Sequence, residues 1–264
     1  GGGMLLGQKI SPRVAKNVAE VAIAKGVPTD IDYFGVAKTQ QLAADGITAD
    51  LVCGANVLAQ VPDLNDFVAG IPLVLRPHGI ATIEFPHVMA TIDGNQFDQF
   101  YHEHFCYFGL LSVERIFARH GMTIFDVEEL PSHGGSLRIY ACRTGDEMHP
   151  TSTNVDSLRE REIAAGYADM TMYEAFEERV RKTKRKLLEV LIDAKRAGKV
   201  IAGYGAPGKG NTLLNYCGIR QDFLDFTVDR NPYKHGRYTP GTHVPIFPPE
   251  RIDEVEPDYI LILP

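Results

Sequence analysis

The sequence predicts an α/β fold, in which a parallel sheet closes on an antiparallel pair of strands and a second, similar unit follows. Two short apolar runs, residues 50–56 and 79–85, are separated by a helical stretch at residues 64–70. This alternation is typical of parallel strands joined by helical crossovers. The same rhythm starts again after Gly198, which predicts the second unit.

Further elements follow from local patterns. VAEVAIAK at residues 18–25 and SVERIFARH at residues 112–120 have helical periodicity, and each is followed by a glycine. Residues 122–127 and 136–142 alternate like strands, and because no helix separates them they should pair antiparallel. Residues 160–196 consist mostly of helix formers without proline, which predicts a long connecting helix or a helix pair.

The second unit is predicted from four segments in order, namely VIAGYG, NTLLNYCGI, FTVDRNP and YILILP. We therefore expect domains at residues 1–150 and 199–264, joined by a helical segment at residues 151–198.

Composition narrows the class of protein. A formal net charge of −7 provides no basic surplus for a nucleic-acid partner. No apolar run approaches the ~18 residues that a membrane span needs, so no membrane partner is expected. The four cysteines form no CxxC pair, which excludes a disulfide framework and suits a reducing cytoplasm.

The segment FYHEHFCYF, residues 100–108, allows three interpretations. His102 and His104, on one side of a strand, could chelate a metal, but further ligands would have to come from the sequence-distant His87, His133 or Glu84. An apolar core segment would have to bury two imidazoles and a carboxylate at a high cost. A carboxylate–imidazole pair between aromatic walls favours proton transfer, because histidine titrates near neutral pH.

The segment GYGAPGKGN, residues 203–211, follows a predicted strand and opens a predicted helix. Glycines there allow backbone N–H groups to approach an anion, and Lys209 adds a positive charge. Asp229 ends the next strand, where a ribose-binding acid would lie. A tight turn without a ligand remains the alternative.

Two more positions are candidates for contact with a ligand. HGGS, residues 133–136, predicts a turn between two strands, in which His133 could face a substrate. Asn56 ends an apolar strand, and open α/β sheets bind ligands at this end of their strands.

Several longer motifs together resemble one family. They are NVLAQVPDLNDF, IEFPHV, QFDQFYHEHFCYFGLLSVERIFARHGM, HGGSLRIYA and GYGAPGKGNTLLNYCGI, and they match in order from about Val18 to Pro264. The family is that of the S-adenosylmethionine-dependent sugar C-methyltransferases, which act on nucleotide-linked 4-keto-deoxysugars. The resemblance implies a Rossmann-like methyltransferase sheet, incomplete on its N-terminal side, followed by a second Rossmann-like domain.

The resemblance also implies roles for particular residues. His104 would be the base that removes the sugar proton, with Tyr101 and Glu103 beside the sugar. The carbanion-like carbon then attacks the sulfonium methyl in line, and no metal is required. The residues expected at the methyl donor, S-adenosyl-L-methionine, are Phe34, Gly35, Ala55 and Asn56, and those expected at the nucleotide-sugar substrate are Gln60, His133, Gly203, Tyr204, Gly205, Lys209 and Asn211.

Departures from the family pattern set further expectations. Gln60 stands where the family usually carries a histidine, and it cannot exchange protons. No strand feeding a donor-binding glycine loop is expected before Val18, and the zinc module's cysteines are absent from the sequence. We expect a chain shortened at both ends, with weak donor binding and an unpaired sheet edge that favours self-association into a homo-oligomer. An NAD-dependent oxidoreductase using Asp229, and a non-catalytic protein that binds sugar nucleotides, remain alternatives.

Overall fold

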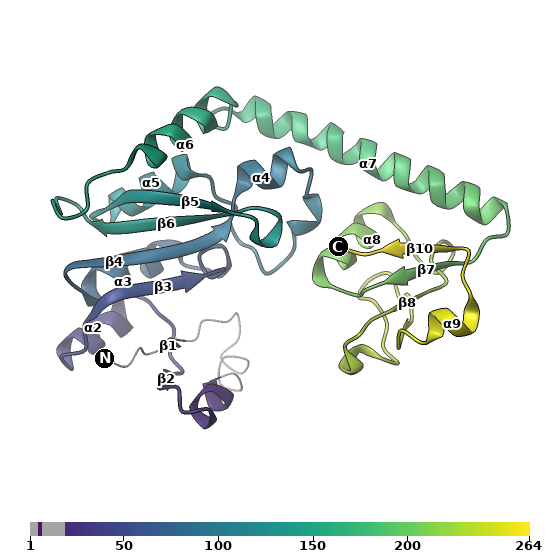
Figure 1. Ribbon diagram of the computed structural model, residues 1–264, viewed down its shortest axis with the longest axis horizontal. Coiled ribbons are helices and arrows are strands. Elements are labelled where there is room, and N and C mark those ends of the chain that lie inside the picture. The colour runs from purple at the N-terminus through teal and green to yellow at the C-terminus, as the bar shows by residue number, and fades with distance from the viewer. Residues whose placement is uncertain (1–4, 7–18) are drawn as a thin grey trace. The chain divides into compact units, whose positions relative to one another are not determined.

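The computed structural model describes residues 5–6 and 19–264, and the chain forms two compact units (Figure 1). Unit 1 consists of residues 1–94 and 103–172, and unit 2 consists of residues 95–102 and 173–264. The segment FYHEHFCYF is therefore divided between the units after His102. The domain limits expected at residues 150 and 198 stay a prediction.

Unit 1 contains strands and helices that are interspersed along the chain. They are β1 (Leu5–Leu6), β2 (Thr29–Asp30), α2 (Val36–Ala44), β3 (Ala49–Ala55), the 3-10 helix η1 (Leu58–Gln60), α3 (Leu64–Val74), β4 (Leu75–Pro86), α4 (Val88–Asp93), α5 (Leu110–Arg119), β5 (Met122–Leu130), the 3-10 helix η3 (Ser132–Gly134), β6 (Ser136–Arg143) and α6 (Thr153–Ala164).

The main sheet of unit 1 has the strand order β3-β4-β6-β5. β3 and β4 are parallel, whereas β6 pairs antiparallel with both β4 and β5. The predicted parallel sheet closing on an antiparallel pair is thus confirmed. β1 and β2 form a separate parallel pair, and β3 is an edge strand of the described sheet. The expected self-association through this edge stays a prediction.

The core of unit 1 lies between this sheet and its helices. Ile83 and Phe85 on β4 alternate with more exposed residues, so one face of the strand is fully buried. α5 buries Leu110, Val113 and Phe117, which lie at the helical spacing that the sequence predicts. These side chains belong to one hydrophobic cluster, which fixes the strands whose ends carry the candidate site.

Unit 2 is a second α/β unit. Its elements are the 3-10 helix η2 (Phe97–Gln99), α7 (Met170–Arg196, whose first residues belong to unit 1), β7 (Ile201–Tyr204), α8 (Gly208–Cys217), β8 (Phe226–Val228), the 3-10 helix η4 (Pro232–Lys234), β9 (Ile246–Phe247), α9 (Arg251–Val255) and β10 (Tyr259–Ile262). The strands are parallel in the order β10-β7-β8-β9. Read from the other edge, this is the order 3-2-1-4 of a Rossmann-like sheet, as the sequence predicts.

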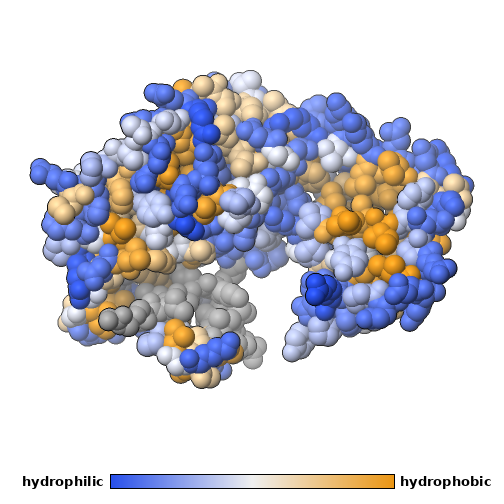
Figure 2. Space-filling view, viewed as in Figure 1, coloured by the Kyte–Doolittle hydropathy of each residue, from blue (hydrophilic) through white to orange (hydrophobic). Residues whose placement is uncertain are grey.

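The strand β10 forms one edge of this sheet. Figure 2 shows hydrophobic residues gathered over unit 2 near β10, where Tyr259, Ile260 and Ile262 are exposed.

Residues 160–196 are divided between α6 and α7, which confirms the expected helix pair rather than one long helix. Among the described residues, no helix has the length and apolar character needed to cross a bilayer.

The structure corrects two expectations. Residues 100–107 form an irregular loop rather than a strand, so the idea that His102 and His104 share one side of a strand is wrong. A short strand, β1, lies at Leu5–Leu6, before Val18, where no strand is expected. Residues 7–18, which include Val18, where a helix is expected to start, lie outside the described residues.

A buried carboxylate joins three elements of unit 1. Glu162 on α6 accepts hydrogen bonds from the backbone N–H of Leu110 (2.6 Å) and Leu111 (2.9 Å) at the start of α5. It also contacts Nε2 of His87 at 2.7 Å, and both side chains are at most 2% exposed. Burial alone would raise the pKa of Glu162, but the hydrogen bonds outweigh it and hold the pKa below its ordinary value.

We predict that Glu162→Ala lowers the free energy of unfolding by roughly 3 kcal/mol, because it leaves His87 and two N–H groups buried without their partner. The measurement is urea denaturation, with the exposed Glu160→Gln on the same helix as the control. Equal stability of the two variants would contradict this role.

The same carboxylate predicts how stability depends on pH. Because the pKa of Glu162 is lowered by folding, its contribution is fully present above the unfolded value near 4.5 and is lost as the pH falls through the folded value. The difference in stability between the wild type and Glu162→Ala should therefore shrink below pH 4.5. A difference that stays constant down to pH 3 would contradict this assignment.

Candidate functional site

Three loops of unit 1 meet at the ends of β3 and β4. The loop after β3 contains η1, and the backbone oxygen of Ala59 in η1 accepts a hydrogen bond from the N–H of Phe105 at 2.8 Å. The β5–β6 loop joins the same region, because the N–H of His87 donates to the oxygen of Gly135 at 3.0 Å. His87 also forms a β-bridge with Phe108. Phe105 and Phe108 are thus fixed to η1 and to His87, the residue that follows β4.

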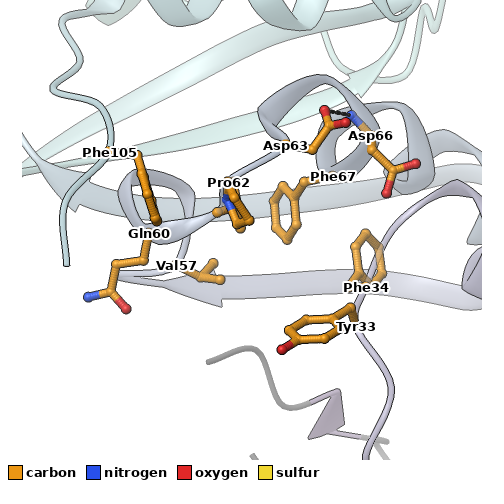
Figure 3. A pocket seen from close by; sticks show the side chains of 10 residues that line it. Tyr33, Phe34, Val57, Gln60, Pro62, Asp63, Asp66, Phe67 and Phe105 are labelled. Carbon is orange, nitrogen blue, oxygen red and sulfur yellow. Dashed lines mark hydrogen bonds between the residues drawn. The ribbon is translucent and has the colours of Figure 1, made fainter. Parts of the chain in front are cut away.

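A pocket of about 250 Å³ lies beside these loops (Figure 3). Its walls are mainly aromatic or aliphatic, with two carboxylates at its border, and its lining residues are Tyr33, Phe34, Val57, Gln60, Val61, Pro62, Asp63, Asp66, Phe67 and Phe105. The rings of Phe34 and Phe67 lie 5.2 Å apart at one end, and Gln60 and Phe105 lie at the other. Such a wall suits a flat, apolar ring system.

Two of the expected donor residues, Phe34 and Gly35, lie at this pocket or next to it. Phe34 is 8% exposed and lines the pocket. Gly35 begins α2, and a Cβ there would lie 1.9 Å from Oδ2 of Asp66. Oδ1 of Asp66 accepts a hydrogen bond from the N–H of Val36 at 3.1 Å. Close approach to Asp66 therefore explains the glycine without any ligand.

His104 belongs to unit 1 and is half-buried. Its ring meets that of Tyr107 edge-on at 5.8 Å, and its Nδ1 atom is buried. Glu103, in the same unit, is exposed. Tyr101 and His102 instead group with unit 2, where their rings lie 6.3 Å apart. The structure thus brings His104 and Glu103 into one unit, but not Tyr101.

The residues at the end of β3 and in the β5–β6 loop meet. Nδ2 of Asn56 lies 3.4 Å from Nε2 of His133. Ala55, the last residue of β3, is exposed beside them. The substrate-facing position predicted for His133 and the ligand position predicted for Asn56 are therefore adjacent, although 77 residues separate them in the sequence.

Glu84 on β4 holds the two loops that carry Asn56 and His133. Its side chain accepts hydrogen bonds from Ser132 Oγ (2.7 Å) and Arg138 Nη2 (2.9 Å), and its backbone oxygen accepts from the N–H of Asn56 (2.8 Å). The Ser132 hydrogen bond and the Arg138 ion pair hold the pKa of Glu84 below its ordinary value, against the effect of burial. In the sequence, Glu84 is a candidate only for a metal ligand, although an acid near the end of an apolar strand indicates such a supporting role.

Packing or backbone conformation explains three glycines of the glycine-rich turn of unit 2. A Cβ at Gly203 would lie 2.6 Å from Oγ1 of Thr227, and Gly205 has a φ of +94°. A Cβ at Gly210 would lie 2.9 Å from Cβ of Leu263, whereas one at Gly208 would meet nothing within 4 Å. The close helix–strand approach that the dinucleotide pattern assigns to Gly208 is made by Gly210 instead.

Asp229 is bound within this turn. It accepts hydrogen bonds from the N–H of Ala206 (2.8 Å), from Nζ of Lys234 (2.8 Å) and from the N–H of Asn231 (2.8 Å). Burial raises its pKa, but these contacts more than compensate and hold the pKa below its ordinary value. Three of about four acceptor positions are occupied, so Asp229 is poorly placed to bind a ribose, which disfavours the NAD alternative.

The remaining predicted residues of unit 2 lie around the same turn. Tyr204 is exposed at the end of β7, and Lys209 and Asn211 lie in the first turn of α8. The Oδ1 atom of Asn211 is buried without a hydrogen-bond partner. In the part of the chain that the structure describes, no cluster of three His, Cys, Asp or Glu side chains could hold a metal ion.

We predict that Gly210→Ala lowers the free energy of unfolding by about 1–3 kcal/mol, because its methyl group overpacks against Leu263. Gly208→Ala is the matched control, and it should leave stability unchanged or slightly raised. Thermal unfolding of both variants measures the difference. Equal effects would show that Gly210 is not the packing glycine.

Solved structures with some likeness to the chain include several methyltransferases. The protein PH0226 from Pyrococcus horikoshii OT3 has a TM-score of 0.41 and 15% identity, over 54% of this chain and 73% of that one. The mitomycin 7-O-methyltransferase MmcR has a TM-score of 0.40 and 14% identity, over 54% of this chain and 42% of that one. These likenesses are too partial to support an argument.

A curated relative gives a stronger similarity. The chain is 33% identical over 261 residues to the C-methyltransferase NovU of Streptomyces niveus, which covers 97% of this chain. The chain spans 62% of the length of that relative.

A family model gives the most direct assignment. The model described as the C-methyltransferase C-terminal domain matches residues 131–264, just over half of the chain. The matched region begins at the β5–β6 loop and includes all strands of the unit 2 sheet. The chain therefore belongs to the C-methyltransferase family.

Proposed function

We propose that the protein is an S-adenosyl-L-methionine-dependent C-methyltransferase that acts on a nucleotide-linked 4-keto-deoxysugar. One observation carries the proposal. A single pocket in unit 1 is lined by Phe34, expected at the donor, by Gln60, expected at the substrate, and by Phe105, which follows the expected base His104. One residue expected at the donor and one expected at the substrate share this pocket, and the residue next to the expected base borders it, which supports a transfer between them.

The described residues fit one end of the methyl donor. The aromatic wall of Phe34 and Phe67 suits the adenine ring, and the orphaned Oδ1 of Asn56 offers an acceptor at the end of β3. We assign Phe34 and Gly35 to the adenine, and Ala55 and Asn56 to the sulfonium end. When bound, the donor supplies a methyl group already activated for attack by carbon.

In the proposed mechanism, His104 removes the proton from the carbon next to the ketone. Its half-buried position excludes part of the bulk water, while Glu103, in the same unit, orients the sugar. The negative charge that develops on the keto oxygen must be met by hydrogen-bond donors. Gln60 can donate such a bond but cannot relay a proton, so a single imidazole serves as the base.

The glycine-rich turn of unit 2 is proposed to bind the nucleotide part of the substrate. Lys209 adds a positive charge in the first turn of α8, and Tyr204 offers a ring at the end of β7. Gly203 and Gly205 shape the turn, because the N–H of Gly205 is already bonded to the oxygen of Val228 at 2.7 Å. Asn211 adds a polar side chain in the first turn of α8. The occupied carboxylate of Asp229 supports a sugar nucleotide over NAD as the ligand.

The first test is proton abstraction alone. We predict that the chain exchanges the proton next to the ketone of a TDP-linked 4-keto-6-deoxysugar for deuterium in heavy water, without any methyl donor. His104→Asn should lower this rate by at least about 100-fold, a typical contribution of a general base. His102→Asn, which changes an exposed neighbour, is the control.

Proton NMR measures both rates. No exchange by the wild type above the spontaneous rate would contradict the proposed reaction. Exchange that survives in His104→Asn would instead contradict the role of His104.

The second test is donor binding. We predict weak but measurable binding of S-adenosylhomocysteine by calorimetry and no binding of NAD, because Phe34 and Phe67 form the adenine wall while Asp229 is occupied. Phe34→Ala should weaken binding at least fivefold, with Tyr233→Ala, an exposed ring in unit 2, as the control. NAD binding with no response to S-adenosylhomocysteine would favour an oxidoreductase.

A further inference from the structure

Three described residues of unit 1 other than glycine have a left-handed backbone, namely Asn56, His78 and His133, and two of them, Asn56 and His133, contact each other. Asn56 has a φ of +54° and His133 a φ of +55°. Glycine adopts this left-handed region most readily, and asparagine and histidine occur there more often than most other residues, at a cost on the order of 1 kcal/mol. The neighbours of His133 in the loop, Gly134 and Gly135, are both glycines. A loop selected for stability alone would favour glycine at residue 133 as well.

The two strained residues come from different loops and contact each other. Nδ2 of Asn56 lies 3.4 Å from Nε2 of His133. With the amide nitrogen as the donor, Nε2 is the acceptor and a neutral imidazole carries its proton on Nδ1. Asn56 thereby selects the tautomer of His133, whose side chain is exposed.

Stability does not explain this pair. The Oδ1 atom of Asn56 is buried without a hydrogen-bond partner, which costs about 1–3 kcal/mol. The strain persists because the surroundings fix both loops: Glu84 accepts from Ser132 Oγ and from the N–H of Asn56. In addition, Gly135 lies so close to Ala90 that a Cβ would be 2.5 Å from it. Strain kept in place by such support is typical of functional sites.

We propose that His133 is a second catalytic residue, which donates a hydrogen bond from Nδ1 to the keto oxygen of the substrate, and that Asn56 positions it. The inference rests on the proposed function. The loop of His133 adjoins that of the base, because His87 contacts both Gly135 and Phe108.

The electrons and protons balance in this step. His104 takes the proton, the C–H electron pair becomes the C=C bond, and the carbonyl π pair moves onto the oxygen. His133 keeps its proton and stabilises the enolate oxygen through the hydrogen bond. The neutral imidazole can donate this hydrogen bond because, in the tautomer that Asn56 selects, its proton lies on Nδ1.

The test compares stability with proton exchange. His133→Gly should leave the free energy of unfolding unchanged or raise it, because the strain is relieved. It should also lower the exchange rate of the TDP-linked 4-keto-6-deoxysugar about 100-fold, the usual effect of losing one donor to an oxyanion. The matched control is His243→Gly, since His243 is also exposed and has a φ of +57°.

A second variant tests the tautomer. In Asn56→Asp a carboxylate replaces the amide and accepts from Nε2–H, which moves the proton of a neutral imidazole away from Nδ1; the rate is compared at alkaline pH, where the carboxylate does not leave the ring doubly protonated. The exchange rate should then fall nearly as far as in His133→Gly, while the chain stays folded. A ¹⁵N-resolved NMR spectrum of the His133 ring should show the change of tautomer.

The outcomes separate the two proposals. If the wild type exchanges the proton and both variants do so at its rate, the assignment of His133 is wrong while the proposed function stands. If His133→Gly destabilises the chain and keeps exchange, the residue is structural. If the wild type itself shows no exchange, the proposed function fails and this assignment fails with it.

Discussion

The contacts of Glu84 are the constraint on which the unit 1 site depends. This one residue near the end of β4 binds the loop after β3 through its backbone oxygen and the β5–β6 loop through its carboxylate. Arg138, opposite it on β6, completes the ion pair across the antiparallel register. Because the parallel and antiparallel parts of the sheet meet at β4, a carboxylate here can hold loops from both parts, and no other strand of the sheet has this position.

Much of the fold could be predicted from the sequence, because burial leaves a pattern in it. The buried alternation of β4, the amphipathic spacing of α5 and the adjacency of β5 and β6 all rest on short-range periodicity. α2 was missed because only Thr39 and Leu42 of its nine residues are buried, so it has little apolar periodicity. The strands β2 and β9 have two residues each, which is too short for any pattern.

The candidate site was less predictable, because its contacts are long-range. The sequence singled out His133 and Asn56 separately, but nothing in it indicates that they meet. The positive φ of both residues was equally hidden, since the neighbouring glycines suggest that the turn needs left-handed backbone elsewhere. For residues 100–108 the aromatic spacing suggested a strand, whereas hydrogen bonds of Phe105 and Cys106 to the oxygen of Ala59 fix an irregular loop instead.

Two pairs of polar side chains beside the candidate sites are bonded in opposite ways, although both units contain buried polar atoms without a partner and left-handed residues other than glycine. In unit 2, the acid and the lysine after β8 bind each other and the glycine-rich turn, so the turn is rigid and its charges are balanced. In unit 1, a strained asparagine with an orphaned oxygen contacts a strained histidine. A rigid, neutralised turn is suited to binding, which needs a fixed shape. Uncompensated polar groups destabilise the fold and are suited to a reaction in which new charge appears, because the developing charge supplies the partner that the resting protein lacks.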